Sequence, residues 1–190
     1  KLKNVFYSLH QRNHRRIVTI DGKVSYVGGF NIGKEYLGQN PKFGPWRDYH
    51  VRIHGEGAAD MERKFAEDWK EDTGEKMPIH ESIPTLGNVK YQYLFSNGKG
   101  LWEKYGALLK KAKKSLIIAT PYFVPSKEMV KELKAALNRG VNVKILVPFK
   151  SDAILLKQAA YPYLKDMLHA GAEIYQYRNG FFHGKVTIID

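Results

Sequence analysis

The chain lacks several features, and each absence excludes a class of protein or site. It has no cysteine among its 190 residues, so disulfides and thiolate metal sites are excluded. No apolar run approaches the roughly 20 residues that a membrane-spanning helix needs. Acidic residues are scarce: the chain has 19 Asp and Glu but 31 Lys and Arg, which gives a formal net charge of +12. This excess of cations indicates an anionic partner, which either a membrane surface or nucleic acid would provide.

One short pattern is present twice, once near each end of the chain. It reads His, any residue, a cation, four mostly apolar residues and then Asp. The two copies are His14–Asp21 and His183–Asp190. One copy would be weak evidence, but a chain of this composition should contain far fewer than two by chance. The repeat therefore indicates one site built from two halves.

The spacing inside each copy places an imidazole beside a cation. In a strand, residues i and i+2 share a face, so His14 should lie with Arg16 and His183 with Lys185. Imidazole can attack phosphorus or transfer protons near neutral pH. A guanidinium or ammonium group binds phosphate oxygens and stabilises the charge of the transition state. We therefore expect phosphoryl transfer through a phosphohistidine, with no metal ion and no other cofactor.

Further stretches carry a family resemblance. The paired motifs resemble the H-x-K-x4-D motifs of the phospholipase D superfamily, and Gly28-Gly29-Phe30-Asn31 resembles the G-[GS]-x-N segment that follows the first of them. Within the superfamily the chain is most similar to bacterial cardiolipin synthases. The stretches that support this are Asn13–Asp21, Tyr26–Gly33, Pro45–Asp48, His50–Gly55, Thr120–Pro125, Lys144–Pro148 and Asn179–Asp190.

The resemblance implies a reaction and a location. The reaction is phosphatidyl transfer between two phosphatidylglycerol molecules, which yields cardiolipin and glycerol. The partners would be anionic phospholipid and the membrane surface, with nucleic acid not expected. Members of this family carry membrane helices ahead of the catalytic region, so we expect the parent protein at the cell membrane and this part of it to be soluble. Incomplete sheet edges would favour a dimer or a swapped oligomer.

The resemblance also assigns roles to individual residues. The expected catalytic residues are His14, Arg16, Asp21, His183, Lys185 and Asp190. The expected phosphate ligands are Arg16, Asn31 and Lys185. Arg16 stands where the family usually has Lys, and the two cations differ in shape. The two motif Asp residues follow strands, so we expect them to shape the site and not to transfer protons.

A histidine that attacks phosphorus works best when its second nitrogen donates to a carboxylate. Asp48 is expected to orient His14 in this way, with Glu35 as the substitute. The corresponding partner of His183 is expected beyond Asp190.

Alternating strand and helix patterns predict an α/β fold, and the resemblance implies that this fold is similar to that of phospholipase D. We expect a mixed sheet flanked by helices, in two half-site lobes that are both truncated. Residues 1–75 would form the end of the first lobe, 76–88 a linker and 89–190 the second lobe up to its motif.

Local signals place individual elements. Asp21-Gly22 predicts a hairpin turn, Val89–Phe95 a strand, and Gly33–Gly44 a loop. Ser126 and Asp152 are each expected to cap the start of a helix.

Two other functions stay open at this level. One is a phospholipase D-type phosphodiesterase or nuclease, because the same motifs would cleave other phosphodiesters. The other is a basic domain that only binds anionic lipid or nucleic acid, without catalysis.

Overall fold

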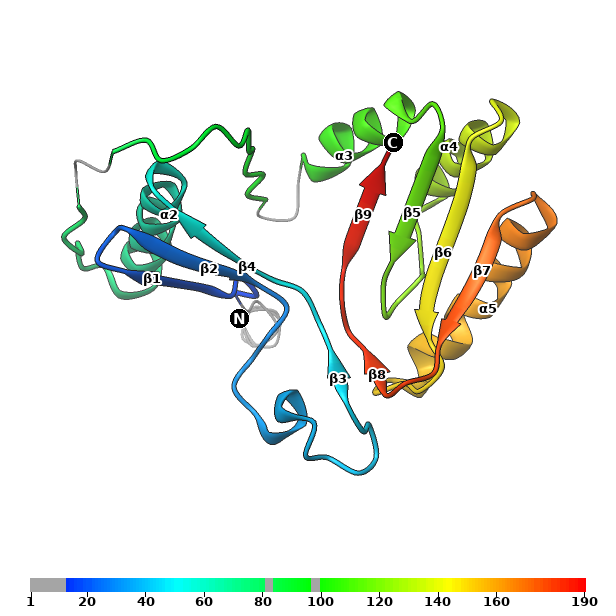
Figure 1. The fold of residues 1–190 in the computed structure, drawn as a ribbon, viewed down its shortest axis with the longest axis horizontal. Helices are drawn as coiled ribbons and strands as arrows, with labels where there is room; N and C mark the ends of the chain where they lie inside the picture. The colour runs from blue at the N-terminus through cyan, green and yellow to red at the C-terminus, as the bar shows by residue number, and fades with distance from the viewer. Residues whose placement is uncertain (1–12, 81–83, 97–99) are drawn as a thin grey trace, which may run out of the picture. The chain divides into compact units, whose positions relative to one another are not determined.

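The chain is described by a computed structural model that covers residues 13–80, 84–96 and 100–190. These residues form two compact units, both drawn in Figure 1. The first unit contains the described residues up to Gly28 and those from His50 to Val89. The second unit contains Gly29–Tyr49 and the described residues from Lys90 to Asp190.

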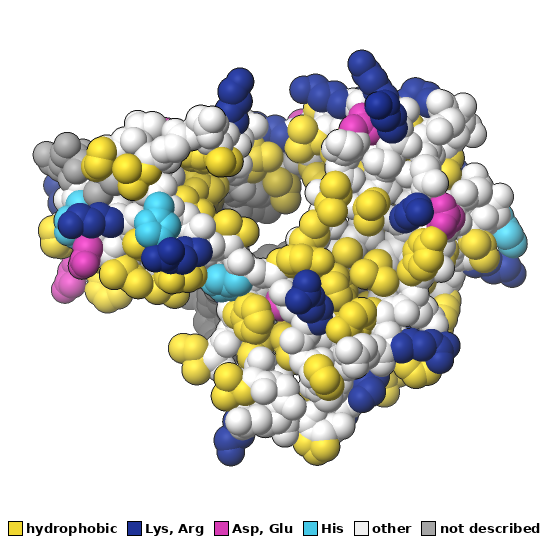
Figure 2. Space-filling view, in the orientation of Figure 1, with side chains coloured by type: hydrophobic (Ala, Val, Ile, Leu, Met, Phe, Trp, Pro, Cys, Tyr) yellow, Lys and Arg dark blue, Asp and Glu magenta, His cyan; other side chains and the backbone are white. Residues whose placement is uncertain are grey.

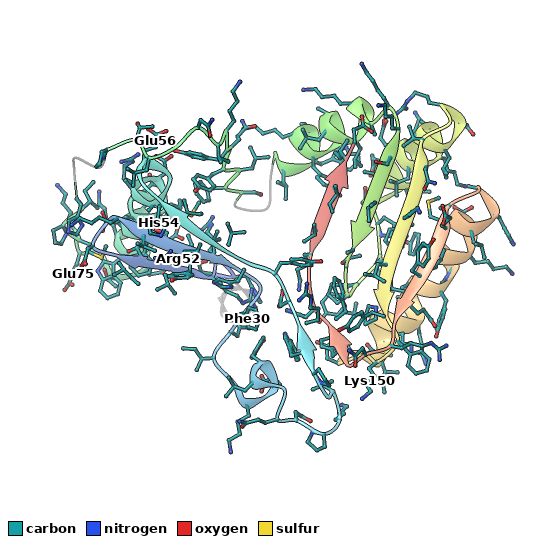
Figure 3. The ribbon with its side chains drawn as sticks, in the orientation of Figure 1. Phe30, Arg52, His54, Glu56, Glu75 and Lys150 are labelled. Carbon is teal, nitrogen blue, oxygen red and sulfur yellow. The ribbon has the colours of Figure 1, made fainter. Side chains whose placement is uncertain are left out.

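The division into units differs from the division expected from the sequence at one segment. Residues 29–49 lie in the first half of the chain but cluster with the second unit. Lys150, labelled in Figure 3, contributes to this, because its Nζ donates to the carbonyl of Phe43 at 3.4 Å. Within the same segment the ring of Phe30 lies 6.2 Å from that of Tyr36. Part of the expected linker, residues 81–83, lies outside the described residues.

The first unit is a three-stranded antiparallel sheet with one helix. Its strands are β1 (Ile17–Ile20), β2 (Val24–Gly28) and β4 (His50–His54), in the order β1-β2-β4. The expected hairpin turn at Asp21-Gly22 is confirmed, since both residues have positive φ angles, of 51° and 61°. Arg52 and His54 belong to β4, as Figure 3 shows.

Helix α2 (Glu56–Thr73) covers one face of this sheet. Its buried residues include Ala58 and Met61. The hydroxyl of Ser25 on β2 is fully buried and donates to the carbonyl of Ala58 at 3.1 Å. This bond satisfies a polar group that would otherwise be costly to bury at the sheet–helix contact.

The second unit is built on a four-stranded mixed sheet. Its strands are β5 (Ser115–Ala119), β6 (Asn142–Pro148), β7 (Glu173–Tyr177) and β9 (Val186–Ile189), in the order β7-β6-β5-β9. Strands β5, β6 and β7 are parallel, and β9 is antiparallel to β5. A short strand outside this sheet, β8 (Phe181–Phe182), lies between β7 and β9 in the sequence.

Three helices pack on one side of this sheet, as Figure 1 shows: α3 (Leu101–Lys111), α4 (Lys127–Asn138) and α5 (Ile154–His169). Between them and the sheet lies the main hydrophobic core, which includes Leu116, Leu133 and Ile145 with no exposed surface. The opposite face of the sheet is seen in Figure 2, where hydrophobic side chains gather over β5 and β9. Among the described residues, no helix has the length and apolar composition needed to cross a membrane.

Two local predictions are wrong and one is confirmed. Val89–Phe95 forms no strand: Val89 is 85% exposed, and none of the strands in the described part of the chain pairs with this segment. Asp152 does not cap α5, whose N-cap is Ala153 without a side-chain bond. Ser126 does cap α4, and its hydroxyl accepts from the backbone N–H of Met129 at 3.2 Å.

Candidate active site

Segment 29–49 joins the second unit through a short parallel strand pair. Strand β3 (Trp46–Arg47) lies beside β8, with Trp46 opposite Phe181 and Arg47 opposite Phe182. The N–H of Phe181 donates to the carbonyl of Pro45 at 2.9 Å, and the N–H of His183 donates to that of Arg47 at 2.8 Å. This ladder brings the residue after β3 beside the residue after β8.

Those two residues are Asp48 and His183, and their side chains form a buried pair. Nδ1 of His183 lies 2.7 Å from Oδ2 of Asp48, and the Asp48 side chain is 1% exposed. The expectation that Asp48 orients His14 is therefore wrong, and so is the expectation that the partner of His183 lies beyond Asp190. Residues far apart in sequence meet here because β3 pairs with β8, a contact that local patterns do not encode.

The backbones of Gly29 and Tyr49 lie against the Asp48 carboxylate and hold it in place. The N–H of Tyr49 donates to Oδ1 of Asp48 at 2.8 Å, and the N–H of Gly29 donates to the carbonyl of Tyr49 at 3.0 Å. A Cβ atom on Gly29 would lie 2.2 Å from Oδ1 of Asp48. The glycine is therefore required because no side chain fits between this backbone and the carboxylate.

The opposite nitrogen of the His183 ring faces the motif cation. Nζ of Lys185 lies 3.0 Å from Nε2 of His183, and it also donates to the His183 carbonyl at 2.7 Å. An ammonium can only donate, so Nε2 accepts from it; an ionised carboxylate can only accept, so Nδ1 carries the proton. The arrangement selects the neutral tautomer whose Nε2 lone pair faces the cation. The expected pairing of His183 with Lys185 is present, although both precede β9 instead of lying within a strand.

Aromatic rings surround His183. Its ring centroid lies 5.1 Å from that of Trp46, 5.9 Å from Phe181, and 6.4 Å from each of Tyr36 and Tyr122. The rings limit the access of water, which strengthens the electrostatic interactions of the imidazole with its two charged neighbours. Sequence reasoning missed Tyr36 and Trp46; the closeness of Trp46 to Asp48 in the chain was the available signal.

Tyr122 links this site to the start of α5. Its ring lies 5.7 Å from Nζ of Lys185, in a cation–π arrangement. Its hydroxyl donates to Asp152 at 2.6 Å. Burial and the neighbouring Asp152 carboxylate raise the pKa of Tyr122, so the phenol stays protonated and a donor. Asp152, which was expected to cap a helix, therefore holds the ring of Tyr122 beside Lys185 instead.

The first motif lies in the first unit, and its flanking residues are anchored to α2. Asn13 donates to Asp68 at 2.9 Å, and Arg15 donates to both carboxylate oxygens of Asp68 at 2.8 and 2.9 Å. Burial alone would raise the pKa of Asp68, but hydrogen bonds from Asn13, Lys64 and Arg15 outweigh it and lower that pKa. The anchoring of residues on both sides fixes the backbone at His14.

His14 itself is exposed, and Arg16 is half-buried. The guanidinium of Arg16 donates to the carbonyl of His14 at 3.2 Å. Asn31, the third expected phosphate ligand from this half of the chain, lies in the second unit, where its amide donates to the hydroxyl of Tyr36 at 2.7 Å. Glu35 lies against the backbone of Gly33.

The two motif Asp residues both end their strands in the left-handed conformation, with φ of 51° for Asp21 and 55° for Asp190. The carboxylate of Asp190 accepts from the backbone N–H groups of Lys113, Lys114 and Ser115 at 2.8 to 3.2 Å. These bonds hold the pKa of Asp190 below its ordinary value. Asp190 thus fixes the connection between α3 and β5 through its carboxylate.

Comparison with known proteins shows which families and proteins this chain is similar to. A family model described as "Cardiolipin synthase, PLD-like domain" matches residues 105–190. The minor cardiolipin synthase of Bacillus subtilis is 44% identical over 97% of this chain, and the major one of the same organism is 40% identical over 100% of it. The cardiolipin synthase of Halalkalibacterium halodurans is 39% identical over 100% of the chain. The chain spans 40% to 47% of the length of these relatives.

A solved structure shows the same fold. The phosphatidylserine synthase of Haemophilus influenzae superimposes with a TM-score of 0.65 at 19% identity, and the match covers 93% of this chain and 51% of that one. The predicted phospholipase D-like α/β fold is confirmed. The chain is therefore similar to bacterial cardiolipin synthases over almost all of its length, and its residues 105–190 match the model of their phospholipase D-like domain.

Proposed function

We propose that the protein containing this chain transfers a phosphatidyl group from one phosphatidylglycerol molecule to another. The products are cardiolipin and glycerol, and the intermediate is a phosphatidylated histidine. The names of the relatives and the two motifs support the class of reaction. The net charge of +12 suits an anionic lipid substrate.

One observation carries the proposal: His183 lies between the Asp48 carboxylate and the Lys185 ammonium. The carboxylate fixes the tautomer and stabilises the ring when it becomes positively charged. The ammonium binds a phosphate oxygen at the point where the Nε2 lone pair emerges. A histidine held in this way can serve as the nucleophile or as the proton donor, and in both roles it passes through a cationic state.

The two steps balance with two histidines. In the first, an imidazole nitrogen of one motif attacks phosphorus, the bond from phosphorus to the glycerol oxygen breaks, and the other motif histidine gives that oxygen a proton. In the second, this histidine takes the proton from a hydroxyl of the second phosphatidylglycerol. The hydroxyl oxygen then bonds to phosphorus and the phosphorus–nitrogen bond breaks. We propose His14 and His183 as these two groups.

The test is an assay of the full-length protein with phosphatidylglycerol labelled in its phosphate. Wild type should form labelled cardiolipin, and His14→Ala and His183→Ala should each lower the rate by at least about 1,000-fold. His169→Ala is the matched control, because His169 is an exposed histidine at the end of α5 that belongs to neither motif. An acid quench followed by mass spectrometry of the peptides should identify which motif histidine carries the phosphatidyl group.

The products separate this function from its alternatives. Phosphatidic acid instead of cardiolipin would show that water is the acceptor and that the protein is a phospholipase. Release of nucleotides from DNA without any lipid product would make it a nuclease. Undiminished cardiolipin formation in either His→Ala variant would refute the mechanism.

A further inference from the structure

A pocket of about 340 Å³ opens beside Lys185 in the second unit. It lies between the carboxyl end of β5, the first residues of β9 and the start of α4. Its lining consists of Tyr105, Ile118, Ala119, Thr120, Tyr122, Phe123, Val124, Pro125, Met129, Lys185, Val186 and Thr187. Ligands of open α/β sheets commonly bind at the carboxyl ends of parallel strands, and this pocket is at such an end.

The side chains of the pocket are mostly apolar, and the few polar groups are already engaged. The hydroxyls of Tyr105 and Thr187 bond to each other at 2.7 Å. That of Tyr122 donates to Asp152 at 2.6 Å, and that of Thr120 bonds to the Tyr122 backbone. Little hydrogen-bonding capacity is left for a glycerol headgroup, whose free hydroxyls would each need a partner. The chemistry of the lining favours a hydrocarbon.

The charge at the pocket fixes where a phosphate would lie. Lys185 is the single cation of the lining, and its Nζ is 3.0 Å from Nε2 of His183. A phosphate bound by this ammonium would stand next to the pocket, within a few bonds of any chain attached to it. An apolar pocket with a cation at its edge is complementary to an anionic group that continues into a hydrocarbon.

We propose that this pocket binds the first methylenes of one acyl chain of the phosphatidyl donor. The inference rests on the proposed function and specifies how the donor lipid is recognised. The volume is at the small end for a ligand pocket, so it suits part of one chain and not two complete chains. Met129 adds a flexible wall that can adapt to a chain. The pocket thereby selects which side of the phosphodiester faces inward and which side leaves.

The first test fills the pocket by Val124→Trp in the full-length protein. Val124 is 42% exposed, so a larger side chain at this rim does not need space in the core. The substrates are monoacyl phosphatidylglycerols with chains of increasing length, kept below their micelle concentration. Wild type should gain about fourfold in kcat/KM for each methylene that enters the pocket, which is the transfer free energy of one methylene expressed as a ratio. Val124→Trp should lose most of this dependence on chain length.

Two controls isolate the pocket from the chemistry. Ile154→Trp makes a comparable enlargement at a side chain that is 68% exposed and does not line the pocket, and it should keep the wild-type dependence. The deacylated donor, glycerophosphoglycerol, should be used equally by wild type and Val124→Trp. An equal loss with the deacylated donor would overturn the proposal, because the pocket would then be holding the headgroup or shaping the catalytic residues.

A second measurement does not depend on turnover. Phosphatidylglycerol with a diazirine near the carbonyl end of one chain should, on irradiation, label peptides from residues 118–129, and Val124→Trp should reduce that labelling. Labelling without cardiolipin formation would refute the proposed function but would still support acyl-chain binding in the pocket. Cardiolipin formation with no label in the pocket, together with an unchanged chain-length dependence in Val124→Trp, would refute acyl-chain binding in the pocket. It would still support the proposed function.

Discussion

Asp48→Asn is expected to exchange the donor and acceptor nitrogens of the His183 ring, although the side chain at position 48 keeps almost the same volume. Oδ1 of Asp48 accepts from the N–H of Tyr49 at 2.8 Å, and Oδ2 faces Nδ1 of His183 at 2.7 Å. If the amide of Asn keeps its oxygen toward Tyr49, its NH₂ group faces His183. The ring must then move its proton to Nε2, where it meets the ammonium of Lys185, and Nε2 loses the lone pair that accepts from this ammonium. If the amide flips, its NH₂ group opposes the N–H of Tyr49.

Both orientations therefore lose one buried hydrogen bond, and both remove the negative charge. A hydrogen bond to a charged group is worth about 1.5–3 kcal/mol, which corresponds to roughly 10- to 150-fold in rate at 1.36 kcal/mol per tenfold. Solvent screens this pair little, because the Asp48 side chain is 1% exposed. In each orientation two hydrogen-bond donors also face each other, and this repulsion lowers the rate further. We expect kcat to fall by about 100-fold or more.

The assay is the rate of cardiolipin formation from labelled phosphatidylglycerol in the full-length protein. KM should stay close to that of wild type, because Lys185 and the lipid contacts are unchanged. Asp166→Asn is the matched control: it makes the same chemical change in a surface ion pair with Lys134 and should alter the rate by less than about twofold. A variant Asp48→Asn with wild-type kcat, or with a raised KM and unchanged kcat, would contradict this account of His183.

Three further predictions concern the same unit. Gly29→Ala should lower kcat at least as much as Asp48→Asn does, because the added Cβ would displace the Asp48 carboxylate; activity near wild type would show that the segment relaxes freely. Leu133→Ala should lower the free energy of unfolding by about 2–5 kcal/mol, measured in urea, since Leu133 is fully buried in the core. Asp190→Asn should lower the unfolding temperature at neutral pH. Because the folded pKa of Asp190 is depressed from 3.8, its stabilisation is present above about pH 4 and is lost as the pH falls through the lower folded value. In calorimetry the difference from wild type should therefore shrink on acidification, and a constant difference would contradict the role of the backbone bonds.

Patterns that act within a few residues were predictable from the sequence. The Asp21-Gly22 turn, the Ser126 cap and the pairing of His183 with Lys185 each depend on spacing of no more than three residues. Their physics is local, so composition and order suffice to specify them.

Features that depend on a distant partner were not predictable in the same way. The pattern in Val89–Phe95 predicts a strand, but a strand also needs a neighbouring strand to bond with, and no strand among the residues that the structure describes pairs with this segment. The sequence predicts that Asp48 orients a histidine, but in the structure that histidine is His183 and not His14. The choice between His14 and His183 depends on the pairing of β3 with β8, which neither strand reveals by itself.

The insertion of segment 29–49 into the second unit has a consequence for dissecting the protein. Strands β2 and β4 are direct neighbours in the first unit, yet the chain between them leaves to supply β3 and Asp48 to the other unit. A clone that starts at Lys90 would encode the sheet, the helices, His183 and Lys185, but no carboxylate for the imidazole. The gene therefore cannot be divided in sequence at Lys90 without separating Asp48 from His183. Any half-protein complementation experiment must keep residues 29–49 with the C-terminal half.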